Sequence, residues 1–338
     1  MEIPNQKYLK PLFFFIIIYL SLLEFRLSLF SHADHINSII QTSYYITLRA
    51  PQWKEFQNRL IGPFLVKIIA HITTFEYGII YMYVIIALHI IKNLICFICI
   101  KKLTNNYAIA LKYTIYSIFC FIAFLDLYWL YIWDYIDNII FILFIYGVFS
   151  NKNNLYYSVL FIIALLNRES ALFIPLWMII DSIIHKKEET GLKVNIKLYN
   201  NTRLFLGTIL LIGGIVFINL VREYLLIEET AAAKNIEFAM ERPFHFLKNS
   251  KQFFENIYKI DFELNILVNI FLISIPILII KLRNKMDDKV FKLTILFIII
   301  LISIILMGLI NETRIYNTII PFFIFLSLYF FGHIKIDN

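Results

Sequence analysis

The stretch WDYIDNIIFILFIYGVFSNKNNLYYSVLFIIALLNRESALFIPLWMII, residues 133–180, decides the fold class. Two apolar runs in and just beyond it, Leu155–Leu166 and Ala171–Ile184, flank the polar break Asn167–Ser170. Each run would form a helix of about 18–21 Å, which is shorter than a bilayer core of about 30 Å. A single helix through the break would carry two ionised side chains near its centre, each costing roughly 2.5–3.5 kcal/mol. The sequence therefore predicts two short helices whose connecting turn lines a water-filled recess below the membrane surface.

The rest of the chain is equally apolar. Of its 338 residues, 60% are hydrophobic and 16% are charged, with a mean hydropathy of +0.74, whereas soluble domains carry about 25% charged residues. This composition excludes a water-soluble enzyme, a nucleic-acid-binding protein and a disordered chain. We predict an all-α, polytopic transmembrane helix bundle of about ten spans, forming a single integral-membrane domain over residues 1–338. The expected spans are Pro11–Phe30, Tyr77–Ile98, Ala108–Leu125, Tyr135–Phe149, Leu155–Leu166, Ala171–Ile184, Leu204–Val221, Leu264–Ile280, Phe291–Ile310 and Ile315–Phe331.

The distribution of Lys and Arg predicts the orientation of this bundle, because basic residues favour the cytoplasmic side. With both termini in the cytoplasm, most of the 31 basic residues fall in cytoplasmic segments, including the clusters at 185–203 and 281–292 and the side chain of Lys92. The outer side then carries a first loop, residues 31–76, and a long loop, residues 222–262. The first loop contains a weaker apolar run that is expected to be an interfacial or dipping helix, and the long loop is expected to hold amphipathic helices. We therefore predict a multi-pass protein of the cytoplasmic (inner) membrane.

Polar residues interrupt the apolar segments at five places, all on the outer side in this topology. Four of the five breaks combine carboxylates with Arg. A membrane-embedded active site needs such ionised groups from distant parts of a chain on one face of the protein. The candidate residues are Asp34, Arg59, Asp134, Asp137, Arg168, Glu169, Glu312 and Arg314.

The carboxylates among these candidates also have structural interpretations, and the sequence leaves both open. Asp34 suits a solvated loop position or a helix cap as well as a catalytic role. Asp134 and Asp137 lie three residues apart on one helix face and suit an interface-exposed position beside the aromatic residues of that break. A metal held by His32, Asp34 and His35 is a further alternative, because a divalent cation would fit those side chains.

The charged pairs have similar alternatives. The pairs Arg168–Glu169 and Glu312–Arg314 suit ion pairs at helix ends, although charges in a recess more often serve a site. Glu24 and Arg26 are two residues apart, so they cannot face each other on a helix. Both are predicted to snorkel towards the membrane surface.

Residues 133–180 also resemble the middle of the GT-C-type integral-membrane glycosyltransferases, polytopic enzymes that use polyprenyl-phosphate-linked sugars. The shared pattern is a helix start containing aspartate, a short hairpin, and the turn NRESAL before another short helix. The stretch NETRIYNTIIPFFIF, residues 311–325, is similar to the family's E-x-R followed by an apolar helix with proline. QNRLIGPFLV, residues 57–66, resembles an R-L-x-x-P-F segment before the second span.

The resemblance implies roles for individual residues. Asp34 would be the general base in the first outer loop, although the family often has two acidic residues there and this chain has one Asp flanked by His. Arg168 and Arg314 would hold the donor phosphate or organise the site, and Glu169 and Glu312 would orient those arginines or bind sugar hydroxyls. The expected substrate-binding set is Arg59, Asp134, Asp137, Arg168, Glu169, Glu312 and Arg314.

The predicted function is a membrane glycosyltransferase that moves a sugar from a polyprenyl-phosphate donor to an envelope glycan, lipid or protein acceptor on the outer face of the membrane. Its partners would be that donor, that acceptor and membrane lipids, with no nucleic acid; a divalent cation is an open alternative as a cofactor. Three other functions remain open: a lipid-linked-sugar transporter or flippase, a non-catalytic envelope-assembly subunit, and a polysaccharide polymerase. A transporter should show repeat symmetry and charges accessible from both sides.

Overall fold

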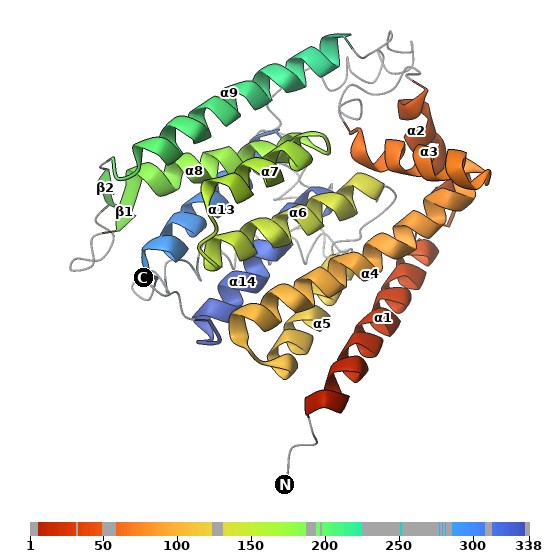
Figure 1. Ribbon diagram of the computed structural model, residues 1–338, viewed down its shortest axis with the longest axis horizontal. Coiled ribbons are helices and arrows are strands. Elements are labelled where there is room, and N and C mark those ends of the chain that lie inside the picture. Colours follow the sequence, from red (N-terminus) through yellow and green to blue (C-terminus); the bar gives the residue numbers. More distant parts are fainter. Residues whose placement is uncertain are drawn as a thin grey trace.

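The computed structural model describes residues 6–31, 33–48, 59–123, 131–186, 194–196, 198–224, 251, 277, 279, 281, 286–307 and 313–334. Apart from one small sheet, the regular elements of this part of the chain are helices (Figure 1). The elements in chain order are α1 (Gln6–Ser31), α2 (Ile36–Thr47), α3 (Ile61–Thr73), α4 (Tyr77–Thr104), α5 (Tyr107–Ala123), α6 (Ile132–Phe149), α7 (Asn154–Leu165), the 3₁₀ helix η2 (Glu169–Leu172), α8 (Phe173–Ile183), β1 (Ile184–Lys186), β2 (Val194–Ile196), α9 (Asn201–Tyr224), α13 (Asp288–Met307), the 3₁₀ helix η4 (Thr313–Thr318) and α14 (Ile320–Phe330).

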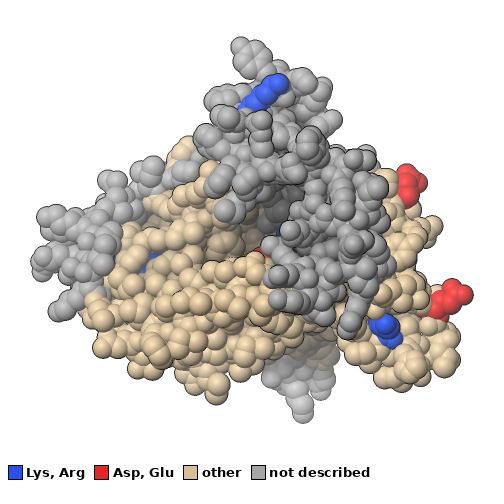
Figure 2. Space-filling model, turned by 90° about the horizontal axis from the view of Figure 1, so that it is seen from above, with Lys and Arg blue, Asp and Glu red and all other residues tan. Residues whose placement is uncertain are grey.

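Five stretches of these helices are long and apolar enough to cross a membrane. Few charged side chains appear on the described surface in Figure 2, which is mostly uncharged. Because such a surface suits lipid rather than water, the chain is an integral membrane protein. The five stretches are Pro11–Phe30, Tyr77–Thr104, Ile132–Phe149, Asn201–Val221 and Asp288–Leu306.

Nine of the ten predicted apolar segments coincide with helices of the structure, namely α1, α4 to α9, α13 and α14. The tenth, Leu264–Ile280, lies largely outside the described residues, as does the long loop 222–262. The weaker run in the first loop forms a helix of its own, α3, which packs against α2, α4 and α6. Most helix boundaries differ from the predicted ones by a few residues. For example, α6 begins at Ile132 rather than Tyr135, where the backbone N–H of Tyr131 donates to the Asp134 carboxylate at 2.9 Å and caps the helix.

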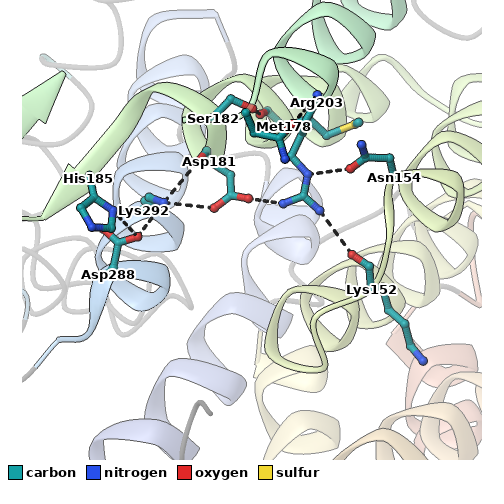
Figure 3. Close-up of polar contacts among 10 residues, drawn as sticks. Lys152, Asn154, Met178, Asp181, Ser182, His185, Arg203, Asp288 and Lys292 are labelled. Carbon is teal, nitrogen blue, oxygen red and sulfur yellow. Dashed lines mark hydrogen bonds and ion pairs between the residues drawn. The ribbon is translucent and has the colours of Figure 1, made fainter. Parts of the chain in front are cut away.

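Helices α7 and α8 form the predicted pair of short helices, joined by a turn and η2. Arg203, at the start of α9, donates through Nε to Asn154 Oδ1 at the start of α7 at 2.7 Å. The same guanidinium pairs with Asp181 near the end of α8 (Figure 3). The two helices therefore run antiparallel as a hairpin. Its tip is the segment 166–172, which confirms the prediction of two short helices meeting at Asn167–Ser170.

Helix α9 lies along this hairpin (Figure 1). A Cβ atom placed on Gly214 would lie 2.8 Å from side-chain atoms of both Leu172 and Phe161, so the glycine lets these side chains approach α9 without shifting. Past Gly214, α9 continues to Tyr224, a further ten residues or about 15 Å. The hairpin therefore ends well before α9 does.

A cluster of charges closes the base of the hairpin, and we call Asp181, Arg203, Asp288 and Lys292 the base cluster (Figure 3). Lys292 Nζ lies 3.3 Å from Asp181 Oδ1 and 2.6 Å from Asp288 Oδ2. These contacts join α8, α9 and α13. His185 adds a contact from β1, since its Nδ1 lies 3.1 Å from Asp288 Oδ2.

The described chain is all-α, as predicted, apart from one two-stranded sheet. β1 pairs antiparallel with β2, with Ile184 opposite Ile196 and Lys186 opposite Val194. The backbone N–H of Lys186 also donates to Asp288 Oδ1 at 2.7 Å. The β1–β2 pair follows α8 directly, where the chain leaves the apolar bundle. The base cluster anchors this pair through Asp288, a contact that hydropathy does not reveal.

Ring contacts and hydrogen bonds show which helix termini lie together at each end of the bundle. At the end that holds the base cluster, Phe13 of α1 stacks on Tyr107 at the start of α5. At the end that holds the hairpin tip, the N–H of Ile132 at the start of α6 donates to the Tyr81 hydroxyl of α4 at 3.3 Å. We call these ends the basic end and the tip end. The basic end carries Lys101, Lys102, Lys152, Lys186, Arg203 and Lys292.

Candidate functional site

The candidate site lies at the tip end, where α6 begins. Asp134 sits in the first turn of α6 and is fully buried, and Asp137 follows one turn later with 1% of its side chain exposed. The Asp134 Oδ2 atom accepts the N–H of Tyr131 at 2.9 Å. A carboxylate at a helix start is stabilised by the helix dipole, so α6 itself holds one of the two charges. Their burial contradicts the interpretation that both aspartates are exposed at the interface.

The tip of the hairpin supplies the cation that neutralises these carboxylates. Arg168 Nη1 lies 3.0 Å from Asp134 Oδ1 and 3.9 Å from Asp137 Oδ2. Ser170 Oγ donates to Asp137 Oδ1 at 2.6 Å. Arg168 is 12% exposed and Ser170 is half-buried, so both are more accessible than the two aspartates. We call Asp134, Asp137, Arg168 and Ser170 the tip cluster.

A second arginine reaches the same region from the start of α3. The N–H groups of Leu60 and Ile61 donate to the Leu166 carbonyl at 2.9 and 3.2 Å, which anchors α3 to the hairpin tip. This places Arg59, which is 5% exposed, 5.1 Å from the ring centroid of Trp133. Arg59 also interacts electrostatically with Asp137. Two arginines thus face two aspartates.

Three buried asparagines surround the tip cluster, and sequence reasoning did not select them as site residues. Asn167 Nδ2 donates to the Trp133 carbonyl at 3.0 Å. Asn138 Nδ2 donates to the carbonyl of Asn317 in η4 at 2.9 Å. Only their place next to charged candidates, in DYIDN, NRES and RIYN, hints at this position. Three polar breaks, at the start of α6, in the hairpin tip and in η4, therefore meet.

The remaining predicted site residues are Asp34, Glu169, Glu312 and Arg314. Asp34 lies in the turn between α1 and α2 and is exposed, so its proposed role as general base stays a prediction. Glu169 opens η2 and is half-buried beside Arg168. His32 and Glu312 lie outside the described residues, and for Arg314 the structure describes only the backbone, in η4.

Metal-binding side chains do not gather in the described part of the chain. Within residues 6–31, 33–48 and the other described ranges, no group of three or more His, Cys, Asp or Glu could hold an ion. The alternative of a metal at His32, Asp34 and His35 includes a residue outside those ranges.

A second buried polar group was interpreted incorrectly from the sequence. Glu24 does not snorkel: it is fully buried between α1 and α4, where it pairs with Lys92. Asn93 Nδ2 donates to Glu24 Oε2 at 2.6 Å, and His89 Nδ1 lies 3.3 Å from the same oxygen. Lys92, counted above as cytoplasmic, instead lies in the middle of α4 with its Nζ 3.4 Å from the ring centroid of Phe121. A charged pair with further hydrogen bonds explains why both charges tolerate this depth.

The arginines of the tip end favour one class of ligand, a molecule that carries a phosphate. Arg offers planar, bidentate donors and stays charged in a low-dielectric site, which suits a phosphate. The two aspartates lie beside the two arginines, so an incoming anion would compete with carboxylates for Arg168.

A comparison of the chain with protein-family models, curated proteins and solved structures found no match.

Proposed function

We propose that this protein is a membrane glycosyltransferase of the GT-C type, which transfers a sugar from a polyprenyl-phosphate donor to an envelope glycan, lipid or protein acceptor. The observation that carries the proposal is the ion pairing of Arg168, at the tip of a broken helical hairpin, with two buried aspartates of α6. Irregular backbone and ionised groups between apolar helices occur where they line a functional cavity. The residues that form this cluster are those on which the family resemblance rests.

In the proposed reaction, an acceptor hydroxyl attacks the anomeric carbon of the sugar. The bond from that carbon to the phosphate oxygen breaks, and the polyprenyl phosphate leaves with the electron pair. Arg168 would neutralise the charge that builds on this leaving group, with Arg59 close by. The aspartates hold Arg168 in place, which makes them positioning residues.

The acceptor hydroxyl must lose its proton during this attack. We assign this step to Asp34, as the family resemblance implies, and the assignment requires that Asp34 come within hydrogen-bond reach of the bound acceptor. Its exposed position in the turn between α1 and α2 suits contact with an acceptor arriving from outside the bundle. Its carboxylate would take up the proton released by the hydroxyl.

The proposed topology has about ten spans, with the basic end in the cytoplasm and the tip end at the outer face of the inner membrane. The gathering of Lys101, Lys102, Lys152, Lys186 and Lys292 at one end of the bundle supports this orientation. The donor's lipid tail would then reach the site sideways from the bilayer.

The test is sugar transfer by the full-length protein in proteoliposomes. The donors are polyprenyl phosphates carrying radiolabelled glucose, mannose or galactose, and the acceptor is a cell-envelope extract. We expect label in the extract for at least one donor, and none with Asp34→Asn. Glu76→Gln is the control, because Glu76 is another exposed carboxylate of the same end; it should transfer at the wild-type rate.

Two results would reject the proposal. Movement of labelled lipid across the bilayer without a covalent product would identify a transporter. Normal envelope function in cells that carry Asp34→Asn together with Arg168→Gln would identify a non-catalytic subunit.

A further inference from the structure

Around the tip cluster, several buried side-chain atoms have no hydrogen-bond partner within the described part of the chain. They are Asp137 Oδ2, Asn138 Oδ1, Asn167 Oδ1, Asn317 Oδ1 and Asn317 Nδ2. All four side chains are at most 1% exposed. A buried polar group without a partner is costly. So many of them in one region indicate that something outside the protein chain binds there.

Hydrogen bonds connect the four residues into one group. Asn138 follows Asp137 on α6 and donates to the backbone of Asn317 at 2.9 Å. Asp137 accepts from Ser170 of the hairpin tip at 2.6 Å. Asn167, in the same tip, donates to the carbonyl of Trp133, one turn before Asp137 on α6. The free atoms therefore come from three segments that meet at the first two turns of α6.

The chemistry of these atoms selects the ligand. Four of the five are oxygens that accept hydrogen bonds, and one is an amide nitrogen that donates. A phosphate carries only acceptors, so it does not suit four oxygens. A hydroxylated ring suits them, because each hydroxyl donates one hydrogen bond and can also accept one.

A divalent cation also prefers oxygen ligands, but the surrounding charges oppose it. Arg168 Nη1 lies 3.9 Å from Asp137 Oδ2, the one carboxylate oxygen of the group that accepts no hydrogen bond. Because Arg168 and Arg59 already lie beside the aspartates, a divalent ion at Asp137 Oδ2 would be placed against two cations. A neutral polyol adds no charge.

We propose that Asp137, Asn138, Asn167 and Asn317 form the subsite that recognises the hydroxyl groups of the donor's sugar ring. This inference rests on the proposed function for the identity of the donor, and it assigns the phosphate and the sugar to different residues. Arg168 serves the phosphate, and the carboxamides beside it serve the ring. The subsite contributes discrimination between sugars, because a buried acceptor left without its hydroxyl penalises the wrong ligand.

The test measures binding to the full-length protein in nanodiscs. The probes are bare polyprenyl phosphate, polyprenyl phosphate carrying glucose, mannose or galactose, and Mg²⁺ or Mn²⁺ alone. For the wild type, at least one sugar-bearing lipid should bind more tightly than the bare lipid. Asn317→Leu should reduce this advantage by about tenfold, the usual effect of losing one hydrogen bond, and leave binding of the bare lipid unchanged.

Asn317→Leu should disturb the fold little, because the Asn317 side chain makes no hydrogen bond in the described structure that the change would remove. Asn317→Asp is the second variant, which keeps an acceptor but loses the amide donor. It should retain part of the sugar advantage and gain no metal binding. Asn37→Leu on α2 is the matched control, since Asn37 is exposed, and it should behave as the wild type.

The outcomes separate the two proposals. Bare polyprenyl phosphate that fails to bind overturns the proposed function. If the bare lipid binds but no sugar-bearing form binds more tightly, or if Asn317→Leu leaves the advantage intact, the sugar subsite is wrong. Stabilisation by Mg²⁺ or Mn²⁺ alone that strengthens in Asn317→Asp would identify a cation site instead.

Discussion

The two ends of the α7–α8 hairpin carry similar charges but use them differently. At the base, Arg203 pairs with Asp181 and also donates to Asn154 and to the Lys152 carbonyl, and Lys292 bridges Asp181 to Asp288. Within the described structure, no buried side-chain polar atom of the base cluster lacks a hydrogen bond. At the tip, Arg168 reaches two aspartates, but Asp137 Oδ2 and the neighbouring carboxamides keep unused hydrogen-bonding atoms.

This difference separates a structural cluster from a candidate binding site. A buried charge network whose bonds are all made within the protein rigidifies the fold and offers nothing to a ligand. A network with atoms left over is unfavourable unless a ligand or water completes it. The hairpin therefore has a closed base that fixes its position and an incomplete tip.

The largest effect is expected from removing Arg168, the arginine of the tip. Arg168→Gln should lower sugar transfer by roughly 100-fold or more, the loss seen when one donor to a developing charge is deleted. Because Asp134 would then be buried without its cation, the double variant Arg168→Gln/Asp134→Asn is needed alongside. The double variant should regain thermal stability but not transfer. Transfer at the wild-type rate in either variant would show that the tip is not a site.

Removing Arg203, the arginine of the base, should lower stability but not turnover. Arg203→Gln leaves Asp181 and Asn154 without their shared partner, so unfolding should become easier by about 3 kcal/mol, the lower end for a broken buried pair. Turnover per folded molecule should stay unchanged. Thermal unfolding in detergent and transfer by the folded fraction measure the two quantities.

The matched control for Arg203→Gln is Lys152→Met. Figure 3 shows the Lys152 side chain pointing away from Arg203, which binds only the Lys152 backbone carbonyl. Lys152→Met should therefore unfold like the wild type. A loss of turnover in Arg203→Gln with normal stability would remove the distinction between base and tip.

Hydropathy predicted the helices well because each apolar run has to satisfy its backbone within itself in lipid. The hairpin tip was predicted for the same reason, since Arg168 and Glu169 would be too costly inside one helix. The pairing itself was not predictable: Arg168 and Asp134 are 34 residues apart, and sequence placed them only on the same side of the membrane.

For the buried Glu24–Lys92 pair, prediction from hydropathy gave the wrong positions of both side chains. Its members are 68 residues apart, and hydropathy treats an isolated charge in an apolar run as a boundary or a snorkelling residue. One signal was present: His89, Lys92 and Asn93 have the spacing of a single helix face. A polar stripe within an otherwise apolar helix requires a partner such as Glu24. The asparagines around the tip gave only a weak signal, because each stands beside charged candidates in a polar break and nothing in the sequence shows which distant segment it faces.

A smaller effect is expected from changing how α9 supports the tip. Gly214→Ala would force a methyl group against Leu172 and Phe161, and overpacking of this kind costs about 1–3 kcal/mol. Because Leu172 ends η2, the strain should also displace the tip and reduce transfer. The neighbouring Gly213 has nothing within 4 Å of its Cβ position, so Gly213→Ala is the matched control and should retain full transfer. Equal behaviour of the two variants would show that α9 does not position the tip.

The smallest effect should come from the edge of the base cluster. His185 is 47% exposed and contacts Asp288, which keeps its bonds to Lys292 and to the Lys186 N–H when the imidazole is lost. Exposed pairs of this kind contribute at most about 1 kcal/mol, so His185→Asn should lower the unfolding temperature only slightly. A drop as large as that of Arg203→Gln, measured in the same unfolding assay, would mean that the base depends on the anchored strand β1 and not on the buried pair beneath it.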